Sequence, residues 1–337
     1  MLLAAALAQA ATEPRTETLR LYNWENYLDP QLAAEFARRT GVQIHQSYFT
    51  SDWERDLRIV SNGAADFDLI VLDSTQVAAY ATRGWLAPVG VERVPALAHY
   101  DARWLLPKDA AGYALPYAWG VIGIAYRADL IGKAPDSWSL LFHPPRSLCG
   151  KLLMGDDARE LSAVALKAGG FSGNSTSVAE HRAAERALRE QRPCVGQYRY
   201  PGTLPESPLL SGAAAAGMSY STDAAWLHAS NPQVRFAVPK EGGLMWVDYL
   251  VVVQTSPRKH LAFEFLKFLA EPAVAARQAA YLRAGNPAMK LSAVRALRDS
   301  GVDADAGRFE ASEMILPVPP AIVSLRNQIF ATIKRAD

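Results

Sequence analysis

The chain has 337 residues, a length that favours two domains of ordinary size over one hydrophobic core. Apolar residues make up 50% and charged residues 20%, which is typical of a globular protein and excludes a disordered or fibrous chain. The formal net charge of +1 and the absence of a basic run give no electrostatic case for a nucleic acid or a membrane surface as partner.

The first ten residues, MLLAAALAQA, are similar to the apolar part of a signal peptide and end in the A-x-A-like site Ala8-Gln9-Ala10. Residues 1–12 are therefore predicted to be the remnant of an export signal, although the usual positively charged segment is missing. The alternative is a ragged hydrophobic N-terminus. No later run approaches the roughly 18 apolar residues of a membrane span, so no membrane insertion is predicted.

The first half of the chain alternates between strand and helix patterns. They cover residues 19–23, 30–41, 42–49, 52–63 and 67–73, in the order strand, helix, strand, helix, strand. Pro30 and Gly41 stand near the start and the end of the first helix, and Leu57 and Val60 lie on one side of the second. The last strand is a continuous apolar run, as in buried parallel strands. The order predicts a doubly wound α/β unit.

A second unit with the same alternation follows. Strand patterns cover residues 120–127, 151–156, 212–221, 234–240 and 242–254, and helix patterns cover residues 158–170, 177–191 and 258–282. The last helix is strongly amphipathic, with Leu261, Phe265, Leu266 and Leu269 on its apolar face, and Pro272 is where a break is expected.

The two cysteines, Cys149 and Cys194, are a candidate disulfide if the protein is exported. Closing the loop between them would stabilise the folded protein by roughly 3–4 kcal/mol on the chain-entropy model. Two unpaired buried thiols are the alternative. C-x-x-C spacing is absent, so no zinc site is expected, and the sequence predicts no metal and no cofactor.

Polar and aromatic side chains gather where the predicted strands end, which is where open α/β sheets bind ligands. They are Trp24, Glu25, Tyr27, Asp73, Ser74, Thr75, Asp156, Asp157, Glu160, Tyr220, Asp223, Trp246 and Asp248, with Asn286 in a later loop. Almost no Lys or Arg accompanies them, Arg159 being the exception. Such a site suits an elongated cation, with carboxylates for ammonium groups and aromatic faces for methylenes, each face contributing about 0.5–2 kcal/mol.

Structural roles are the alternative for several of these residues. Trp24 and Trp246 fit a hydrophobic core equally well. Asp157 would cap the helix that follows it, as Asp73 would cap its own, and Asp223 fits a structural role better than a ligand contact.

Enzyme motifs are missing from the chain. There is no G-x-S-x-G, H-E-x-x-H, P-loop or G-x-G-x-x-G sequence. The pair Asp157 and Glu160 would suit a glycosidase, but aromatics at strand ends in two domains fit a closing binding protein better. The expectation is that the protein is not an enzyme.

Five motifs in this order resemble one known family, the bacterial periplasmic spermidine/putrescine-binding proteins of ABC transporters. They are YNW-x-x-Y from Tyr22, FDLIV from Phe67, PYAWG from Pro116, DDARE from Asp156 and PKEGG-x-x-W-x-D from Pro239. The resemblance implies a two-domain α/β Venus-flytrap fold, each domain a mainly parallel sheet flanked by helices, with hinge crossings between them. The implied domains are discontinuous: residues 16–120 plus 248–292, and residues 121–247 plus 293–337.

The resemblance also implies ligand-binding roles. Trp24 and Tyr27 would line the polyamine from the first domain, and Asp157 and Glu160 would take amino groups from the second. Trp246 would stack on the methylene chain beside Asp248, which would pair with a nitrogen. Glu25, Asp73, Thr75, Tyr220 and Asn286 complete the predicted site.

The chain departs from the family at several of these positions. Asp73 stands where a Ser is expected, Thr75 and Asn286 where a Tyr is expected, and Tyr220 where a Trp is expected. Leu316 falls near the family's last glutamine. These differences concern the length of the ligand more than its class, and Asp73 and Glu25 are candidates to receive an additional amine.

Two roles fit the resemblance. The protein would be a monomer in the periplasm that delivers a polyamine to an inner-membrane ABC permease. The alternative is a polyamine sensor that docks on a membrane signalling receptor, for instance one that controls cyclic-di-GMP.

Overall fold

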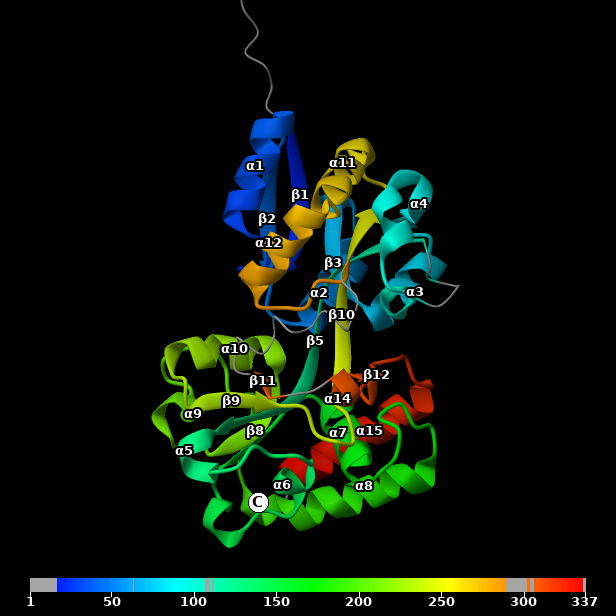
Figure 1. Ribbon diagram of the computed structural model, residues 1–337. Helices are drawn as coiled ribbons and strands as arrows, with labels where there is room; N and C mark the ends of the chain where they lie inside the picture. The colour runs from blue at the N-terminus through cyan, green and yellow to red at the C-terminus, as the bar shows by residue number, and fades with distance from the viewer. Residues whose placement is uncertain are drawn as a thin grey trace, which may run out of the picture.

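The structure is a computed structural model that describes residues 17–62, 64–106, 110, 112–288, 302–303 and 306–335. Figure 1 shows two lobes, one above the other, joined through the middle by two long strands. The predicted export remnant at residues 1–12 lies outside the described residues. Among the helices of the described ranges, none has both the length and the apolar character of a membrane span.

The strands form one mixed sheet. They are β1 (Thr18–Trp24), β2 (Gln43–Phe49), β3 (Leu69–Asp73), β4 (Leu86–Ala87), β5 (Ala114–Arg127), β6 (Leu152–Met154), β7 (Val195–Tyr198), β8 (Ala216–Tyr220), β9 (Val234–Ala237), β10 (Leu244–Val253), β11 (Val302–Asp303) and β12 (Glu313–Met314). The main path runs β2-β1-β3-β10-β5-β8-β6-β7. Pairing is parallel at the two ends of this path and antiparallel around β5 and β10, so only those ends match the mainly parallel sheets that were predicted.

Helices cover both lobes. They are α1 (Pro30–Thr40), α2 (Asp52–Asn62), α3 (Ser74–Thr82), α4 (Gly90–Arg93), α5 (Ala128–Ile131), α6 (Ser139–Phe142), α7 (Ala158–Ala168), α8 (Val178–Gln191), α9 (Pro208–Ser211), α10 (Ser221–Ser230), α11 (Lys259–Leu269), α12 (Pro272–Leu282), α14 (Ala306–Glu310) and α15 (Pro320–Arg335). The helix ends follow local chemistry. Pro30 opens α1 and Gly41 closes it at φ +76°, a left-handed conformation that glycine adopts without strain. Pro272 separates α11 from α12, as the sequence predicts.

The long strands β5 and β10 belong to both lobes (Figure 1). They pair antiparallel from Leu244 opposite Ile122 to Val251 opposite Ala114, with an irregularity between Asp248 and Tyr249. The boundaries predicted at residues 120/121 and 247/248 fall within these two strands. The assignment of the domains stays a prediction, but within the described residues β5 and β10 form a two-stranded ribbon that connects the lobes.

Helix α2 turns a different face inward from the apolar side seen in the sequence. Leu57 and Val60 are exposed, whereas Arg55 and Ile59 are buried, with 1% and 0% of their surfaces accessible. The reason is that several carboxylates surround Arg55 and satisfy its charge in the interior. This departure from the expected pattern lies directly beside the candidate site.

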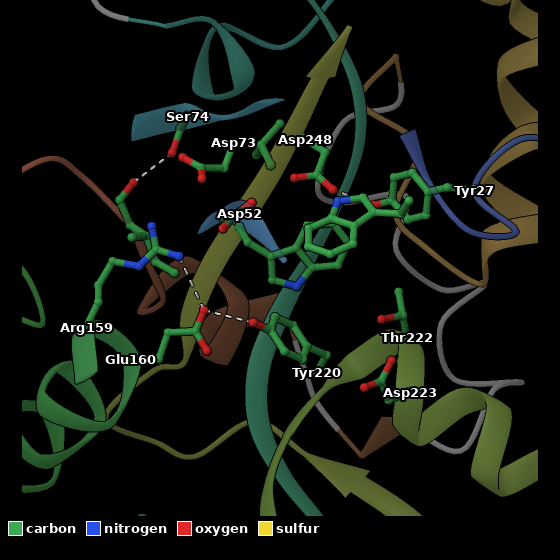
Figure 2. A pocket seen from close by; sticks show the side chains of 14 residues that line it. Tyr27, Asp52, Asp73, Ser74, Arg159, Glu160, Tyr220, Thr222, Asp223 and Asp248 are labelled. Carbon is green, nitrogen blue, oxygen red and sulfur yellow. Dashed lines mark hydrogen bonds and ion pairs between the residues drawn. The ribbon is translucent and has the colours of Figure 1, made fainter. Parts of the chain in front are cut away.

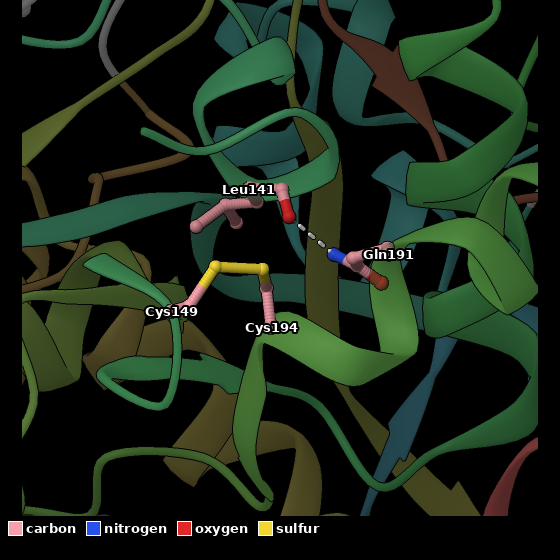
Figure 3. Close-up of a disulfide and its surroundings, with 4 residues drawn as sticks. All are labelled: Leu141, Cys149, Gln191 and Cys194. Atoms are coloured by element: carbon pink, nitrogen blue, oxygen red, sulfur yellow. Dashed lines mark hydrogen bonds between the residues drawn. A yellow bond between two sulfur atoms is a disulfide. The ribbon is translucent and has the colours of Figure 1, made fainter. Parts of the chain in front are cut away.

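A disulfide joins Cys149 and Cys194 (Figure 3). Cys149 precedes β6 and Cys194 precedes β7, so the bridge ties together the segments that enter two neighbouring strands. Gln191 supports the same corner, because its Nε2 donates a hydrogen bond of 2.6 Å to the Leu141 carbonyl. The bridge closes a loop over a sequence separation of 45 residues.

Candidate functional site

A cavity of about 350 Å³ lies where β10 passes between the lobes. Figure 2 shows side chains from both lobes converging on it. It is lined by Trp24, Tyr27, Asp52, Asp73, Ser74, Arg159, Glu160, Tyr220, Thr222, Asp223, Trp246, Val247, Asp248 and Ile315.

The upper wall comes from the loop after β1. Asn26 adopts a positive φ of 56°, which asparagine tolerates better than most residues. In this turn Glu25 is exposed while Trp24 and Tyr27 line the cavity. The Tyr27 hydroxyl donates a hydrogen bond of 2.7 Å to Asp248 Oδ2, and its backbone carbonyl accepts one of 2.7 Å from the Tyr117 hydroxyl. An aromatic ring is thereby fixed against the central carboxylate.

Strand β10 supplies the middle of the cavity through Trp246 and Asp248, which are two residues apart and therefore share one face of the strand. Trp246 pairs with Gly120 of β5. A Cβ atom at Gly120 would lie 2.5 Å from Trp246 Cζ2, so the indole packs directly on the bare backbone of the neighbouring strand. The lack of a side chain at Gly120 therefore sets the position of this ring.

The lower wall is built around Glu160 in the first turn of α7. Its carboxylate accepts a hydrogen bond of 2.8 Å from the Tyr220 hydroxyl and a second hydrogen bond from the Tyr200 hydroxyl. Arg159 lies beside it, with 3.6 Å between Arg159 Nη2 and Glu160 Oε1 (Figure 2). Asp157 caps this helix by accepting a hydrogen bond of 2.9 Å from the Glu160 backbone N–H.

The remaining corner holds Asp52 and Asp73. Asp73 caps α3, since its Oδ1 accepts hydrogen bonds from the backbone N–H groups of Thr75 and Gln76. Asp52 Oδ1 lies 2.7 Å from Arg55 Nη1, and Asp73 Oδ2 lies 3.9 Å from Arg55 Nη2. This corner therefore contains paired charges.

Burial changes the acidity of the lining carboxyl groups. It raises the pKa of Asp248 to about 7, although the hydrogen bond from Tyr27 opposes the change. Burial and the charge of Asp157 raise the pKa of Glu160 to about 7, and burial raises that of Asp223 to about 6. These groups gain most from a cationic ligand, because they are costly to ionise in its absence.

Asp73 behaves differently from these three groups. Burial alone would raise its pKa, but Arg159 and Arg55 together hold the pKa of Asp73 below its ordinary value. Burial lowers the pKa of Arg159, but Asp73 and Glu160 more than offset this effect, so it stays charged. Within the described residues, no group of three or more His, Cys, Asp or Glu side chains is placed to hold a metal ion.

The cavity brings together seven of the eleven ligand contacts predicted from the sequence. They are Trp24, Tyr27, Asp73, Glu160, Tyr220, Trp246 and Asp248. The other four, Glu25, Thr75, Asp157 and Asn286, do not line it. Glu25 and Asp157 are exposed, Thr75 bonds Asp73 through its backbone and hydroxyl groups, and Asn286 is buried with Oδ1 accepting from the Ala288 N–H. Asp157 and Asp73 each cap the helix that follows them, which is the structural role given above as their alternative.

Sequence reasoning missed several lining residues. Asp52 follows β2 and lies at the same edge of the sheet as the residues that follow β1 and β3. The rule of strand ends therefore applies to Asp52 as well. Asp223 lines the cavity although a structural role was favoured, and Ile315 lines it beside the exposed Leu316. Ile315 also accepts a hydrogen bond of 3.0 Å from the Ser74 hydroxyl at its carbonyl oxygen. That contact joins segments 241 residues apart and has no signal in the sequence.

A family profile described as "Bacterial extracellular solute-binding protein" matches residues 31–304, which is most of the chain. The chain belongs to this family. It is 29% identical over 303 residues to the spermidine/putrescine-binding periplasmic protein of Escherichia coli K12, covering 88% of this chain and 85% of that one. It is 30% identical over 278 residues to a norspermidine sensor of Vibrio cholerae, covering 82% of this chain and 76% of that protein.

The fold agrees with the family. The crystal structure of a spermidine/putrescine ABC transporter substrate-binding protein from Streptococcus pneumoniae superimposes with a TM-score of 0.82 at 22% identity, covering 94% of this chain and 98% of that one. The two-domain α/β fold expected of such a solute-binding protein is thus confirmed.

Proposed function

We propose that this protein captures a polyamine of the putrescine and spermidine class in the interlobe cavity and delivers it to an ABC importer. The observation that carries the proposal is the carboxylate of Asp248, held by Tyr27 at the crossing of the lobes in a cavity that Trp24 and Trp246 also line. A carboxylate receives an ammonium group, and indole faces attract the cation and cover the methylene chain.

The charge of the cavity supports a cation as ligand. Five lining residues are carboxylic acids, Asp52, Asp73, Glu160, Asp223 and Asp248, against the single lining arginine Arg159. An anionic ligand would meet repulsion from most of the wall. The relatives in Escherichia coli and Vibrio cholerae are named as a spermidine/putrescine-binding protein and a norspermidine sensor, which agrees with a cationic ligand.

The proposed role places the protein in the periplasm, as a monomer that closes on its ligand and docks on an inner-membrane permease. The family and the export-like first residues support this location. Binding without turnover is the natural use of the cavity, because its carboxylates are spread along two lobes and would pair with a cation. A sensor that docks on a membrane signalling receptor is the second candidate, favoured by the likeness to the norspermidine sensor.

Calorimetry with putrescine, cadaverine, spermidine, norspermidine and spermine tests the proposed function. We expect at least one of them to bind near micromolar affinity, about −8 kcal/mol, with a change in the scattering curve as the lobes close. The variant Asp248→Asn is expected to lose binding while it remains folded. Failure of all five polyamines to bind the wild-type protein would refute the proposal. Loss of uptake or loss of signalling in a deletion strain separates the two candidate roles.

A further inference from the structure

Arg283 and Trp226 make a contact between the two lobes outside the cavity. Arg283 directly follows α12 in the upper lobe, and Trp226 lies on α10 in the lower lobe (Figure 1). The guanidinium carbon of Arg283 lies 4.4 Å from the centroid of the Trp226 ring, which is the geometry of a cation–π interaction. Within the described ranges, no carboxylate lies within ion-pair distance of Arg283. The Trp226 ring is 44% exposed, so packing in a hydrophobic core does not explain its position.

The backbone at Arg283 adopts a conformation that arginine rarely takes. Its φ is +53° at the end of α12, where its N–H bonds carbonyl groups of the last helical turn. Glycine is the usual residue at such a left-handed helix end, as Gly41 is at the end of α1. The chain is fixed two residues later, where Gly285 forms a bridge with Trp119 of β5. An arginine that is retained in a strained position where glycine would fit points to a role for its side chain.

Helix α10 connects this contact to the cavity. Asp223 in its first turn lines the cavity, and Trp226 follows three residues later, so the two side chains lie on the same side of the helix. The Asp223 side chain bonds Thr222, and within the described residues it forms no ion pair. An ammonium group that pairs with Asp223 would therefore hold in place the side of α10 that carries Trp226.

A second contact joins the lobes on the other side of the cavity. The Ser74 hydroxyl, at the start of α3, donates a hydrogen bond of 3.0 Å to the carbonyl of Ile315, which packs in the core of the lower lobe. Figure 2 shows Ser74 on one side of the cavity and Thr222 and Asp223 on the other. The lobes thus meet at two places that flank the cavity. A hydrogen bond and a cation–π contact are each weak enough to form on closure and to break on release.

We propose that Arg283 and Trp226 form a latch between the lobes that keeps the protein closed on its ligand. The inference rests on the proposed function, since it concerns how long the ligand proposed there stays bound. The latch forms only when α10 meets the end of α12, so it is absent while the ligand enters. It therefore slows dissociation of the ligand and leaves its association unchanged. Both are positioning residues, because neither lines the cavity.

Rapid-mixing kinetics with putrescine and spermidine test the latch in the wild-type protein, Arg283→Gly and Trp226→Leu. Both variants should release the ligand about threefold to tenfold faster, as expected for a partly exposed cation–π contact. Association should stay within about twofold. Arg283→Lys keeps a cation and should restore most of the residence time. Arg83→Gly is the matched control, because Arg83 also ends a helix and stacks at 5.5 Å over a tryptophan, Trp85, but within one lobe. It should leave both rates unchanged.

The stability of the ligand-free protein separates a latch from a structural role. Arg283→Gly relieves the left-handed backbone, so urea denaturation should find it at least as stable as the wild-type protein although it releases ligand faster. A structural Arg283 would give lower stability and unchanged dissociation. The double variant should release ligand no faster than the faster single variant, because the two residues form one contact.

Dissociation rates that are unchanged in both Arg283→Gly and Trp226→Leu overturn the inference. So do effects of the two substitutions that multiply in the double variant, since independent effects would mean that the residues do not act through each other. A wild-type protein that binds no polyamine refutes the proposed function instead, and with it the ligand on which the latch would act.

Discussion

Replacing Asp248 by Asn should stabilise the ligand-free protein at neutral and alkaline pH while it abolishes ligand binding. Burial raises the pKa of Asp248 to about 7 from an ordinary value of 3.8. Between these two values the folded protein binds a proton that the unfolded chain releases, so the free energy of unfolding falls as the pH rises through this window. Below about pH 4 the contribution is fully present, and above about pH 7 it is lost.

The size of the effect follows from the same two values. Their difference of about three pH units at about 1.4 kcal/mol each gives an upper limit of about 4 kcal/mol for the cost of ionising Asp248. The side chain keeps part of its accessible surface, so about 1–3 kcal/mol is the expected gain for Asp248→Asn at pH 8. An asparagine oxygen still accepts the hydrogen bond from Tyr27, which preserves the local geometry.

Urea denaturation without ligand at pH 8 and at pH 5 measures this gain. The stabilisation by Asp248→Asn should be largest at pH 8 and shrink at pH 5, where the wild-type carboxyl group is already protonated. Asp66→Asn serves as the control, because it removes an exposed carboxyl group of the same lobe and should change little at either pH. Saturating polyamine should stabilise the wild-type protein by about 2.7 kcal/mol at one hundred times Kd, but not the variant. A stabilisation by Asp248→Asn that is equal at the two pH values, or larger at pH 5, would refute the reasoning.

Three other predictions concern the cavity and its surroundings. Polyamine affinity, measured by calorimetry, should fall at least about tenfold between pH 7.5 and pH 5, because Asp248 and Glu160, each with a pKa of about 7, must be ionised to bind a cation. An affinity that does not change between these pH values would contradict binding through ionised carboxylates. Gly120→Ala should weaken binding about tenfold, because the new Cβ would displace the Trp246 ring; unchanged affinity would mean that the ring does not contact the ligand. Replacing both cysteines of the disulfide by serine should lower the free energy of unfolding by up to about 4 kcal/mol. Polyamine affinity should stay within twofold, since neither cysteine lines the cavity; a large loss of affinity would mean that the disulfide helps to shape the binding site.

Local chemistry explains why much of the fold could be predicted. Proline and glycine mark the ends of α1 and the break before α12, and apolar runs mark the buried strands. The rule of strand ends placed Trp24, Tyr27 and Asp73 at the cavity because the parallel strands β1 and β3 deliver their last residues to one edge of the sheet. It does not account for Trp246 and Asp248, which lie within β10, a strand antiparallel to β3 and β5. It could not tell which way a side chain turns at that edge: Glu25 and Tyr27 leave the same loop and only Tyr27 lines the cavity.

Arg55 shows why the rest could not be predicted. A helix pattern with Leu57 and Val60 on one side suggests an apolar inner face, and a charged residue is rarely assigned to the interior. Asp52 and Asp56 stand close to Arg55 on α2, but Asp73 comes from the end of β3 and meets Arg55 only after the chain has folded. Pairing between distant charges leaves no periodic signal in a single sequence.

The shared strands β5 and β10 have a consequence for the kinetics of binding. Asp248 and Trp246 lie within β10, one of the two strands that join the lobes, so we expect them to move less than the residues of the lobes themselves when the protein closes. Tyr27 and Glu160 lie on the lobes to either side and would travel with them. A ligand can therefore meet Asp248 first, before closure, and substitutions there should slow association. Substitutions of Tyr27 and Glu160 should mainly shorten the residence time, because these side chains complete the enclosure only after capture.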